Sequence, residues 1–304
     1  MDLDALLTRA GSTDVSTVAV AVPEDEDVIE AVAAAAEKNI AVFKLFGNGE
    51  KTRFLLERTK KGLADDPKIS IIHADSAEMA AELAVKSVRK KEASVLMKGG
   101  ISTAVILKAV LNKEWGLRTG RILSHTAAFQ IPGQKKLLLI TDAAMNILPD
   151  LSTKAEIINN AAALARSIGI DNPKVAALAA VELVNQQMPA TLDAALLTQM
   201  NRRGQIKGCL VDGPLALDNA VSIEAAEHKG IHSEAAGKAD ILLVPNIETG
   251  NSLYKSLIYF AHAKVGAVVS GASAPIVLTS RSDSAESKLY SLALAICSAS
   301  HNQL

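Results

Sequence analysis

The chain is poor in aromatic residues and in cysteine, and both shortages exclude classes of protein. Phe, Trp and Tyr make up 3% of its 304 residues, which leaves few side chains on which nucleic-acid bases can stack. The sequence has two cysteines, Cys209 and Cys297, too few for a disulfide framework or a cysteine zinc site. We therefore expect no nucleic-acid partner and a reducing compartment.

An excess of charge and a long apolar run are also lacking. The 32 Lys and Arg nearly cancel the 33 Asp and Glu, so no net field attracts nucleic acid or an anionic membrane, and an anionic ligand must be held by a local site. The sequence contains no apolar run of about 18 residues, and its acidic start, MDLDALLTRAG, lacks the basic start and the continuous apolar stretch of a signal peptide. We expect a cytoplasmic protein that contacts no membrane.

Hydrophobic residues, at 49%, are abundant enough for a large buried core. They form short runs that alternate with longer, Ala-rich amphipathic segments. We expect strands at Thr17–Val22, Ile40–Leu45, Ile69–His73, Ser94–Met97, Lys136–Thr141, Val175–Ala180, Gly208–Val211, Ile241–Val244, Ala267–Ser270 and Ile276–Thr279. Helices are expected at Asp27–Glu37, Ser76–Lys91, Thr153–Ile168 and Ser252–Ala263. Because the strand runs do not alternate with polar residues, they predict α/β architecture with a mostly parallel sheet.

The domain boundary is weakly marked. The segment Gly120–Lys136 carries polar turns, and its IPGQKK contains a Pro and Gly break typical of a linker or a hairpin tip. A division near residue 131 leaves two halves of plausible size.

In open α/β sheets, ligands bind at the carboxyl ends of the strands, so the residues after each strand are candidates for the site. The first is KGGIST, which contributes Lys98, Gly99, Ser102 and Thr103. Backbone amides freed by glycine, with hydroxyls at a helix start, form an anion cradle. The alternative is a plain turn with a helix cap.

Acidic and amide side chains follow two further strands. Asp142 and Asn146 lie on one side of the turn in DAAMN, and Asp212 opens DGPLALD. An Asp at a strand end is also a common helix cap, so each of these residues has a structural alternative. Polar loops at several strand ends nevertheless favour a shared cleft.

Two more loops complete the set. In PNIETGNSLYK, we expect Thr249, Gly250 and Asn251 to lead into a helix whose first turn holds Tyr254 and Lys255, where free amides and the lysine attract an anion. The alternative is a well-capped helix with Lys255 in solvent. SGASAP, which contains Gly271, is a turn at another strand end.

The stretch VLTSRSDSAESK places an arginine among hydroxyl residues. We expect Asp283 to cap a helix that begins at Ser284, with Glu286 completing a capping box, so Ser280 and Arg281 lie in the loop before it. Hydroxyls, amides and a guanidinium there suit the two-point grip of a phosphate. Pairing of Arg281 with Asp283 or Glu286 is the structural alternative.

Taken in order, the blocks DGPLALD, GKAD (Gly237–Asp240), PNIETGNSLYK and TSRSDSAES resemble the phosphate acyltransferases, which include phosphate acetyltransferase and phosphate butyryltransferase. The resemblance runs from about Ser94 to the end. The short chain and VLTSRSDSAESKLYSLALA are more similar to the butyryltransferase branch.

The resemblance implies the reversible reaction of acyl-CoA and phosphate to acyl phosphate and CoA, with no cofactor besides these substrates. It implies a homodimer and a two-domain fold similar to the isocitrate and isopropylmalate dehydrogenases, with the active-site cleft between a domain of residues 1–131 plus 276–304 and a domain of residues 132–275. It implies that Ser280 and Arg281 are the pair of residues that stabilises the transition state and binds the phosphoryl group. The remaining strand-end residues above become substrate-binding candidates.

One residue departs from the family pattern. In the acetyltransferases an acidic residue six positions after this arginine is implied to help deprotonate the thiol, and here that position is Ser287. Glu286 and Asp283 are the nearby acids, although Asp283 is expected to be used as a cap. Phosphate itself or a residue of another loop is the alternative.

Other signals indicate no further chemistry. FGNGEKT lacks the third glycine of a dinucleotide fingerprint and the GK[ST] of a P-loop, so we interpret it as a loop. His228 and His232 have no nearby third ligand, so no metal is expected. Cys209 lies in an apolar strand with no neighbouring His, which favours a core role over that of an acyl-accepting nucleophile.

Three functions stay open at this level. Acyl transfer between CoA and phosphate is the leading one, with butyryl or branched chains preferred over acetyl. A metal- and NAD-dependent dehydrogenase on a similar fold is the second, for which Asp212 and Asp218 supply a fragment of a metal site. A non-catalytic sensor of CoA or acyl phosphate is the third.

Overall fold

The chain forms two compact units, each of which is described by itself. The computed structural model describes residues 1–12, 15–280 and 283–301. The first unit comprises Leu3–Arg121 with Val265–Leu304, and the second comprises Ile122–Lys264 with Met1–Asp2. Among the described residues, no helix has the length and apolar character needed to cross a membrane.

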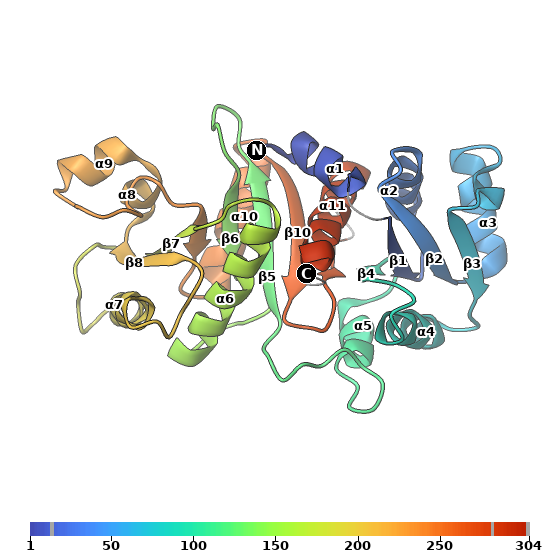
Figure 1. The fold of residues 1–304 in the computed structure, drawn as a ribbon, viewed down its shortest axis with the longest axis horizontal. Coiled ribbons are helices and arrows are strands. Elements are labelled where there is room, and N and C mark those ends of the chain that lie inside the picture. Colours follow the sequence, from blue (N-terminus) through green and yellow to red (C-terminus); the bar gives the residue numbers. More distant parts are fainter. Residues whose placement is uncertain (13–14, 281–282, 302–304) are drawn as a thin grey trace. The chain divides into compact units, whose positions relative to one another are not determined.

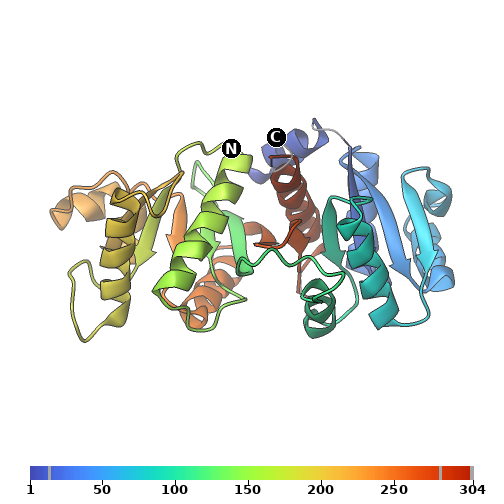
Figure 2. The ribbon, with the colours of Figure 1, turned by 60° about the horizontal axis from the view of Figure 1, so that its bottom comes forward.

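The first unit is a sheet covered by helices on both faces (Figure 1). Its elements are α1 (Leu3–Gly11), β1 (Ser16–Ala21), α2 (Glu26–Glu37), β2 (Ala41–Gly47), α3 (Gly49–Thr59), η1 (Leu63–Asp65), β3 (Ile69–His73), α4 (Ala77–Arg89), β4 (Val95–Lys98), α5 (Thr103–Val110), β10 (Lys264–Ser270), β11 (Ile276–Val277) and α11 (Ala285–His301). The strand order is β3-β2-β1-β4-β11-β10, and all pairs except β10 with β11 are parallel. α2 and α11 pack together on one face, and α4 lies beside α5 on the other (Figures 1 and 2).

The second unit contains five hydrogen-bonded strands in the order β5-β6-β9-β7-β8. Its elements are β5 (Ser124–Gln130), β6 (Leu138–Thr141), α6 (Leu151–Ser167), β7 (Lys174–Leu178), α7 (Pro189–Arg202), β8 (Leu210–Leu215), α8 (Leu217–Val221), α9 (Ile223–His228), β9 (Ile241–Leu243) and α10 (Ile247–Tyr259). β5 pairs antiparallel with β6, and the other pairs are parallel. α6 and α7 lie side by side on one face (Figure 2).

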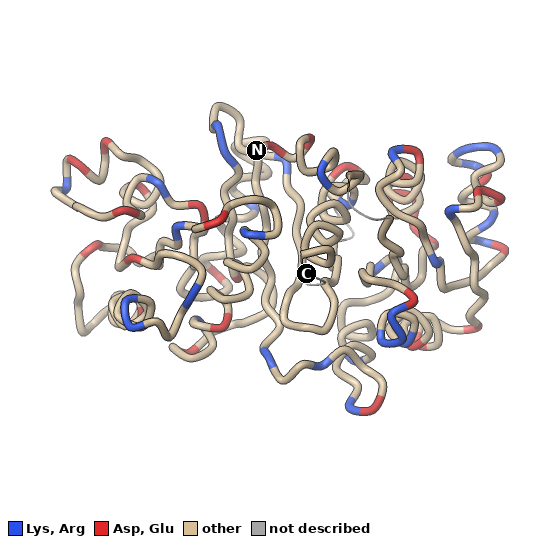
Figure 3. Tube along the Cα trace, viewed as in Figure 1, with Lys and Arg blue, Asp and Glu red and all other residues tan. Residues whose placement is uncertain are grey.

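The local reasons for these elements are visible in the sequence. Asp25, Ser76 and Asn246 end the loops before α2, α4 and α10, and each side chain accepts a backbone N–H in the first turn. The strands are mostly buried, β4 completely, which is why their apolar residues do not alternate with polar ones. Lys and Arg are interspersed with Asp and Glu in both units (Figure 3).

The predicted α/β architecture with mostly parallel strands is confirmed, but individual elements were wrong. β5 was missed because SHTAAFQ carries polar residues, although most of the strand is buried. The strand predicted at Gly208–Val211 is instead Leu210–Leu215, at the end of its sheet, where a proline such as Pro214 costs no ladder bond. The helix predicted from Ser252 begins at Ile247.

The Pro and Gly break belongs to a hairpin inside the second unit. β5 and β6 pair antiparallel, and Gln134 N donates to Ile131 O at 3.0 Å across the turn, where Gly133 has a φ of +80°. The chain therefore passes from the first unit to the second after Arg121 and returns to the first after Lys264. We expected these two crossings after residues 131 and 275. α11 packs on α1 and α2 in the first unit.

Candidate active site

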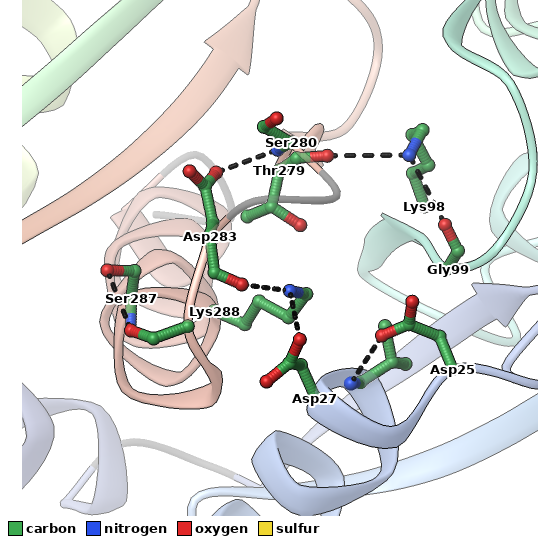
Figure 4. Close-up of polar contacts among 11 residues, drawn as sticks. Asp25, Asp27, Lys98, Gly99, Thr279, Ser280, Asp283, Ser287 and Lys288 are labelled. Carbon is green, nitrogen blue, oxygen red and sulfur yellow. Dashed lines mark hydrogen bonds and ion pairs between the residues drawn. The ribbon is translucent and has the colours of Figure 1, made fainter. Parts of the chain in front are cut away.

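In the first unit, the loops after β4 and β11 lie side by side. The two strands are parallel neighbours, with Leu96 paired to Ile276, so their carboxyl ends reach the same edge of the sheet. Lys98, the last residue of β4, is 4% exposed, and its Nζ donates to Thr279 O at 3.4 Å and to Gly99 O at 3.3 Å (Figure 4). The structure thus brings KGGIST together with the residue before Ser280.

The two glycines of KGGIST serve the packing of the strands. Gly99 N donates to Ala21 O at 2.9 Å, and Gly100 N donates to Val22 O at 2.6 Å. The prediction that glycine frees these amides for an anion was therefore wrong. Ser102 and Thr103 are exposed, and Ser102 caps α5 by accepting Val105 N, so the structural alternative holds for the cap.

Ser280 is exposed in the loop after β11, and it is hydrogen-bonded to Asp283. Ser280 N donates to Asp283 Oδ2 at 2.7 Å, and Asp283 N donates to Ser280 O at 3.2 Å (Figure 4). Arg281, the central residue of the sequence hypothesis, lies outside the described residues.

The start of α11 differs from the prediction. Ser284 accepts Ser287 N at 3.2 Å, so Ser284 takes the capping role expected of Asp283, whose carboxylate is used by Ser280 N. The expected capping box was also wrong, because Glu286 is exposed and accepts Tyr290 OH at 3.2 Å instead. Ser287, at the family's acidic position, has its hydroxyl 3.3 Å from Ser284 Oγ.

Sequence reasoning missed Lys288 completely. This residue is 2% exposed in α11, where its Nζ donates to Asp283 O and lies 3.7 Å from Asp27 Oδ2 on α2 (Figure 4). The signal was present in the sequence, since Lys288 is the one charged residue in SKLYSLALAICSA, a helical run of otherwise apolar and small residues.

Gly271, the candidate in SGASAP, is buried, and its carbonyl accepts Thr119 Oγ1 at 2.5 Å.

In the second unit, Asp142 and Asn146 come together as predicted, but they bind one another and their own loop. Asp142, 2% exposed, accepts Ala144 N and Met145 N at 2.9 Å through Oδ1. Its Oδ2 accepts Asn146 Nδ2 at 2.6 Å, and Asn146 Nδ2 also donates to Leu123 O at 2.8 Å. The carboxylate is thus surrounded by donors of the protein, but it is not the expected helix cap, because α6 begins at Leu151 and is capped by Asp150.

The first turn of α10 packs on this same loop. Gly250 permits the approach, since a Cβ there would lie 2.8 Å from Asp142 O, and Asn251 Nδ2 is 3.5 Å from Ala143 O. Thr249 is exposed, and its N donates to the capping Asn246 Oδ1 at 2.9 Å. Three of the predicted residues therefore lie in the first turns of α10, beside the Asp142 loop.

Tyr254 and Lys255 lie further along α10 than predicted, because the helix begins at Ile247. At about 1.5 Å per residue they are roughly two turns from its amino end, beyond the reach of the free amides there. Tyr254 packs edge-on against Phe129, with ring centroids 5.1 Å apart, and Lys255 Nζ lies 5.7 Å from the Tyr254 ring.

Asp212 lies within β8, in a different part of the second unit. It lines a cavity of about 580 Å³ together with Glu182, Lys229 and His232. Asp218, which the dehydrogenase hypothesis paired with it, is 3.1 Å from Lys229. Asn219 N and the Lys229 ammonium hold the pKa of Asp218 below its ordinary value. Within the described ranges, no group of three His, Cys, Asp or Glu is placed to hold a metal ion.

A second cavity, of about 800 Å³, has mostly apolar walls and includes Thr249. Its polar residues include Lys154, whose side chain is 6% exposed and pairs with Asp193 at 2.6 Å. Leu148, Met188 and Leu253 are among the apolar residues around it.

Comparison with known proteins identifies consistent relatives. Residues 74–296 match the family described as "Phosphate acetyl/butaryl transferase". The chain is 54% identical over 297 residues to "Probable phosphate butyryltransferase" of Bacillus subtilis (98% of each chain) and 47% identical over 302 residues to the phosphate butyryltransferase of Clostridium beijerinckii (99% of each). It is also 45% identical over 278 residues to the phosphate acetyltransferase of Thermotoga maritima, covering 91% of this chain and 93% of the relative.

Solved structures give the same result for the fold. A branched-chain phosphotransacylase from Enterococcus faecalis matches with a TM-score of 0.83 and 37% identity, over 94% of this chain and 99% of that one. A 4-hydroxythreonine-4-phosphate dehydrogenase from Klebsiella pneumoniae matches with a TM-score of 0.55 and 12% identity, over 94% and 100%. The second likeness concerns the fold alone, and it confirms the expected dehydrogenase-like architecture.

Proposed function

Because the chain belongs to the phosphate acetyl/butyryl transferase family, we propose that it transfers a short-chain acyl group reversibly between coenzyme A and inorganic phosphate. Butyryl or branched acyl-CoA is the proposed substrate, since the relatives named above include butyryltransferases and a branched-chain phosphotransacylase. A phosphate acetyltransferase at 45% identity makes acetyl-CoA the second candidate.

The observation that carries the proposal is the meeting of Lys98, Thr279 and Ser280 at one edge of the first unit's sheet. Phosphate attack on the thioester, and thiolate attack on the acyl phosphate, both pass through an oxyanion. We propose that Ser280 and Arg281 donate to that oxyanion and to the phosphoryl group. The buried ammonium group of Lys98 makes this edge of the sheet favourable for negative charge.

The substrate-binding candidates fall into groups according to the contacts that they already form within the protein. Thr249, Asn251 and Lys255, together with Ser102 and Thr103, are retained as candidates. Gly99, Gly250 and Gly271 have backbone roles, and Asp142 and Asn146 brace a loop, so we propose that these five act by shaping the site. Tyr254 packs on β5, and Asp212 lines a separate cavity.

A thiol-release assay tests the function. Purified protein is mixed with phosphate and with acetyl-, butyryl- or isobutyryl-CoA, and free thiol is followed with a colour reagent. We expect phosphate-dependent release, fastest with butyryl- or isobutyryl-CoA, and loss of about a hundredfold or more in kcat for Arg281→Ala and Ser280→Ala. Arg53→Ala, which removes an exposed arginine paired with Asp65, is the matched control and should keep wild-type turnover.

The same preparation separates the other hypotheses. Thiol release in the absence of phosphate, or none with any of the three thioesters, contradicts acyl transfer. Reduction of NAD with hydroxy acids and magnesium would indicate the dehydrogenase, and binding of CoA without turnover would indicate a sensor.

Further properties follow from the proposal. Glu286 is our candidate for the base that deprotonates the thiol, and Glu286→Gln should remove the acidic limb of the pH–rate profile in the direction that consumes CoA.

We also propose a cytoplasmic homodimer that needs no cofactor. Light scattering of the purified protein measures its mass, and activity that survives dialysis against a chelator is the expected result for a metal-free reaction.

A further inference from the structure

Two buried lysines lie at the two ends of the loop that follows β11 (Figure 4). Lys98, at the end of β4, is 4% exposed, and Lys288, in α11, is 2% exposed. Lysine is almost never buried to this degree unless its charge is compensated, because removing an ammonium group from water is costly. What these two ammonium groups contact therefore shows what they do.

Both ammonium groups donate to backbone carbonyls at the ends of the loop. Lys98 Nζ donates to Thr279 O at 3.4 Å, and Lys288 Nζ donates to Asp283 O. The peptide between Thr279 and Ser280 is held on its other side as well, since Ser280 N donates to Asp283 Oδ2 at 2.7 Å. The peptide between Thr279 and Ser280 thus takes part in two hydrogen bonds with charged partners, which are stronger than neutral ones, and Lys288 holds the backbone of Asp283.

Each lysine is anchored in an element that is separate from the loop. Lys98 extends from β4, which pairs with β1 and β11 in the middle of the sheet. Lys288 is 3.7 Å from Asp27 Oδ2 in the first turn of α2, and that turn is itself fixed by Asp25, whose Oδ1 accepts Val28 N at 3.1 Å. The two lysines thus set the position of Thr279 relative to the sheet and that of Asp283 relative to α2.

We propose that Lys98 and Lys288 are positioning residues that hold Ser280 in place for acyl transfer, and that neither ammonium group binds substrate. This inference rests on the proposed function, and it replaces the substrate-binding role expected for Lys98. A displacement of about 1 Å in a catalytic group lowers the rate by roughly a hundredfold. Loss of positioning lowers kcat, whereas loss of a contact made equally in ground and transition states raises KM.

The test is a comparison of kcat with KM in the variants Lys98→Met and Lys288→Met, which keep an unbranched apolar side chain and remove the ammonium group. We expect kcat to fall roughly ten- to a hundredfold, while KM for butyryl-CoA and for phosphate stays within about twofold. Lys68→Met is the matched control, because Lys68 Nζ donates to Ala36 O at 2.8 Å elsewhere in the first unit. Its kcat should stay within about twofold of wild type.

Lys98→Ala and Lys288→Ala supply a second measurement that does not depend on the methionine variants folding well. Ethylammonium chloride should restore part of kcat in a saturable manner, and ethanol at the same concentration should not, because only the cation replaces the lost donor. Wild-type kcat in both methionine variants, or a KM for phosphate raised tenfold at unchanged kcat, overturns the positioning role. If the wild-type protein shows no turnover, the proposed function fails and this inference fails with it; if wild type turns over, only the variants decide the inference.

Discussion

A single methyl group added at Gly99 tests the contact between β4 and β1 that places Lys98. A Cβ at this position would lie 2.0 Å from Val22 O, 2.8 Å from the Val22 carbonyl carbon and 3.0 Å from Ala21 O. All three atoms belong to the backbone of the segment that ends β1, so no side chain can rotate away. In Gly99→Ala the two segments must separate by about 1.5 Å to reach ordinary van der Waals distances.

The cost follows from the bonds that cross this contact. Separation lengthens two hydrogen bonds: the one from Gly99 N to Ala21 O, now 2.9 Å, and the one from Gly100 N to Val22 O, now 2.6 Å. Each bond is worth about 0.5–1.5 kcal/mol net, and the forced backbone shift adds about 1–3 kcal/mol. We therefore expect Gly99→Ala to lose about 4 kcal/mol of stability, and at 2–4 °C per kcal/mol the Tm should fall by about 8–16 °C.

Gly100→Ala is the neighbouring control. A Cβ at Gly100 would meet its nearest atoms at 3.5–3.6 Å, which are ordinary contacts, so its Tm should stay within about 2 °C of wild type. Thermal unfolding followed by circular dichroism measures both variants under one set of conditions. A Tm for Gly99→Ala within 2 °C of wild type, or equal losses in the two variants, would refute the reasoning.

Other changes have equally definite outcomes. Asp142→Asn should destabilise the protein by about 1–3 kcal/mol in urea unfolding, because the new amide would face Asn146 Nδ2. The KM for acyl-CoA should stay unchanged. A raised KM at unchanged stability would instead indicate that Asp142 binds substrate. Burial raises the pKa of the Cys209 and Cys297 thiols to about 11, so at pH 8 a thiol reagent should modify them only after denaturation, and rapid modification of the native protein would contradict this. Between pH 9 and 11 the two thiols stay protonated in the native chain and lose their protons in the unfolded chain. The free energy of unfolding should therefore fall as the pH rises through that window, and the urea midpoint should be lower at pH 10 than at pH 8.

Much of the fold could be predicted because buried parallel strands leave a direct trace in the sequence. β3 was predicted at its observed bounds, and most other strands within a few residues, since a short apolar run between polar turns has few other uses. β5 was missed for the same reason, because its Ser, His and Thr are buried but polar. The start of α10 was misplaced because Gly250 resembles a turn residue, whereas its lack of a Cβ lets the helix approach Asp142.

The sequence by itself determined the alternation of strands and helices, the blocks that mark the family, and which loops follow the strands. It did not determine which polar atoms of those loops are available to a ligand. Only the tertiary structure shows that Asp142 is enclosed by its own loop, that the amide of Gly99 is bound to Ala21, and that Lys98 reaches Thr279 across 181 positions of the chain. The physical reason is that a hydrogen bond depends on a distance of about 3 Å between atoms that can be remote in sequence, and composition and spacing carry no information about that distance.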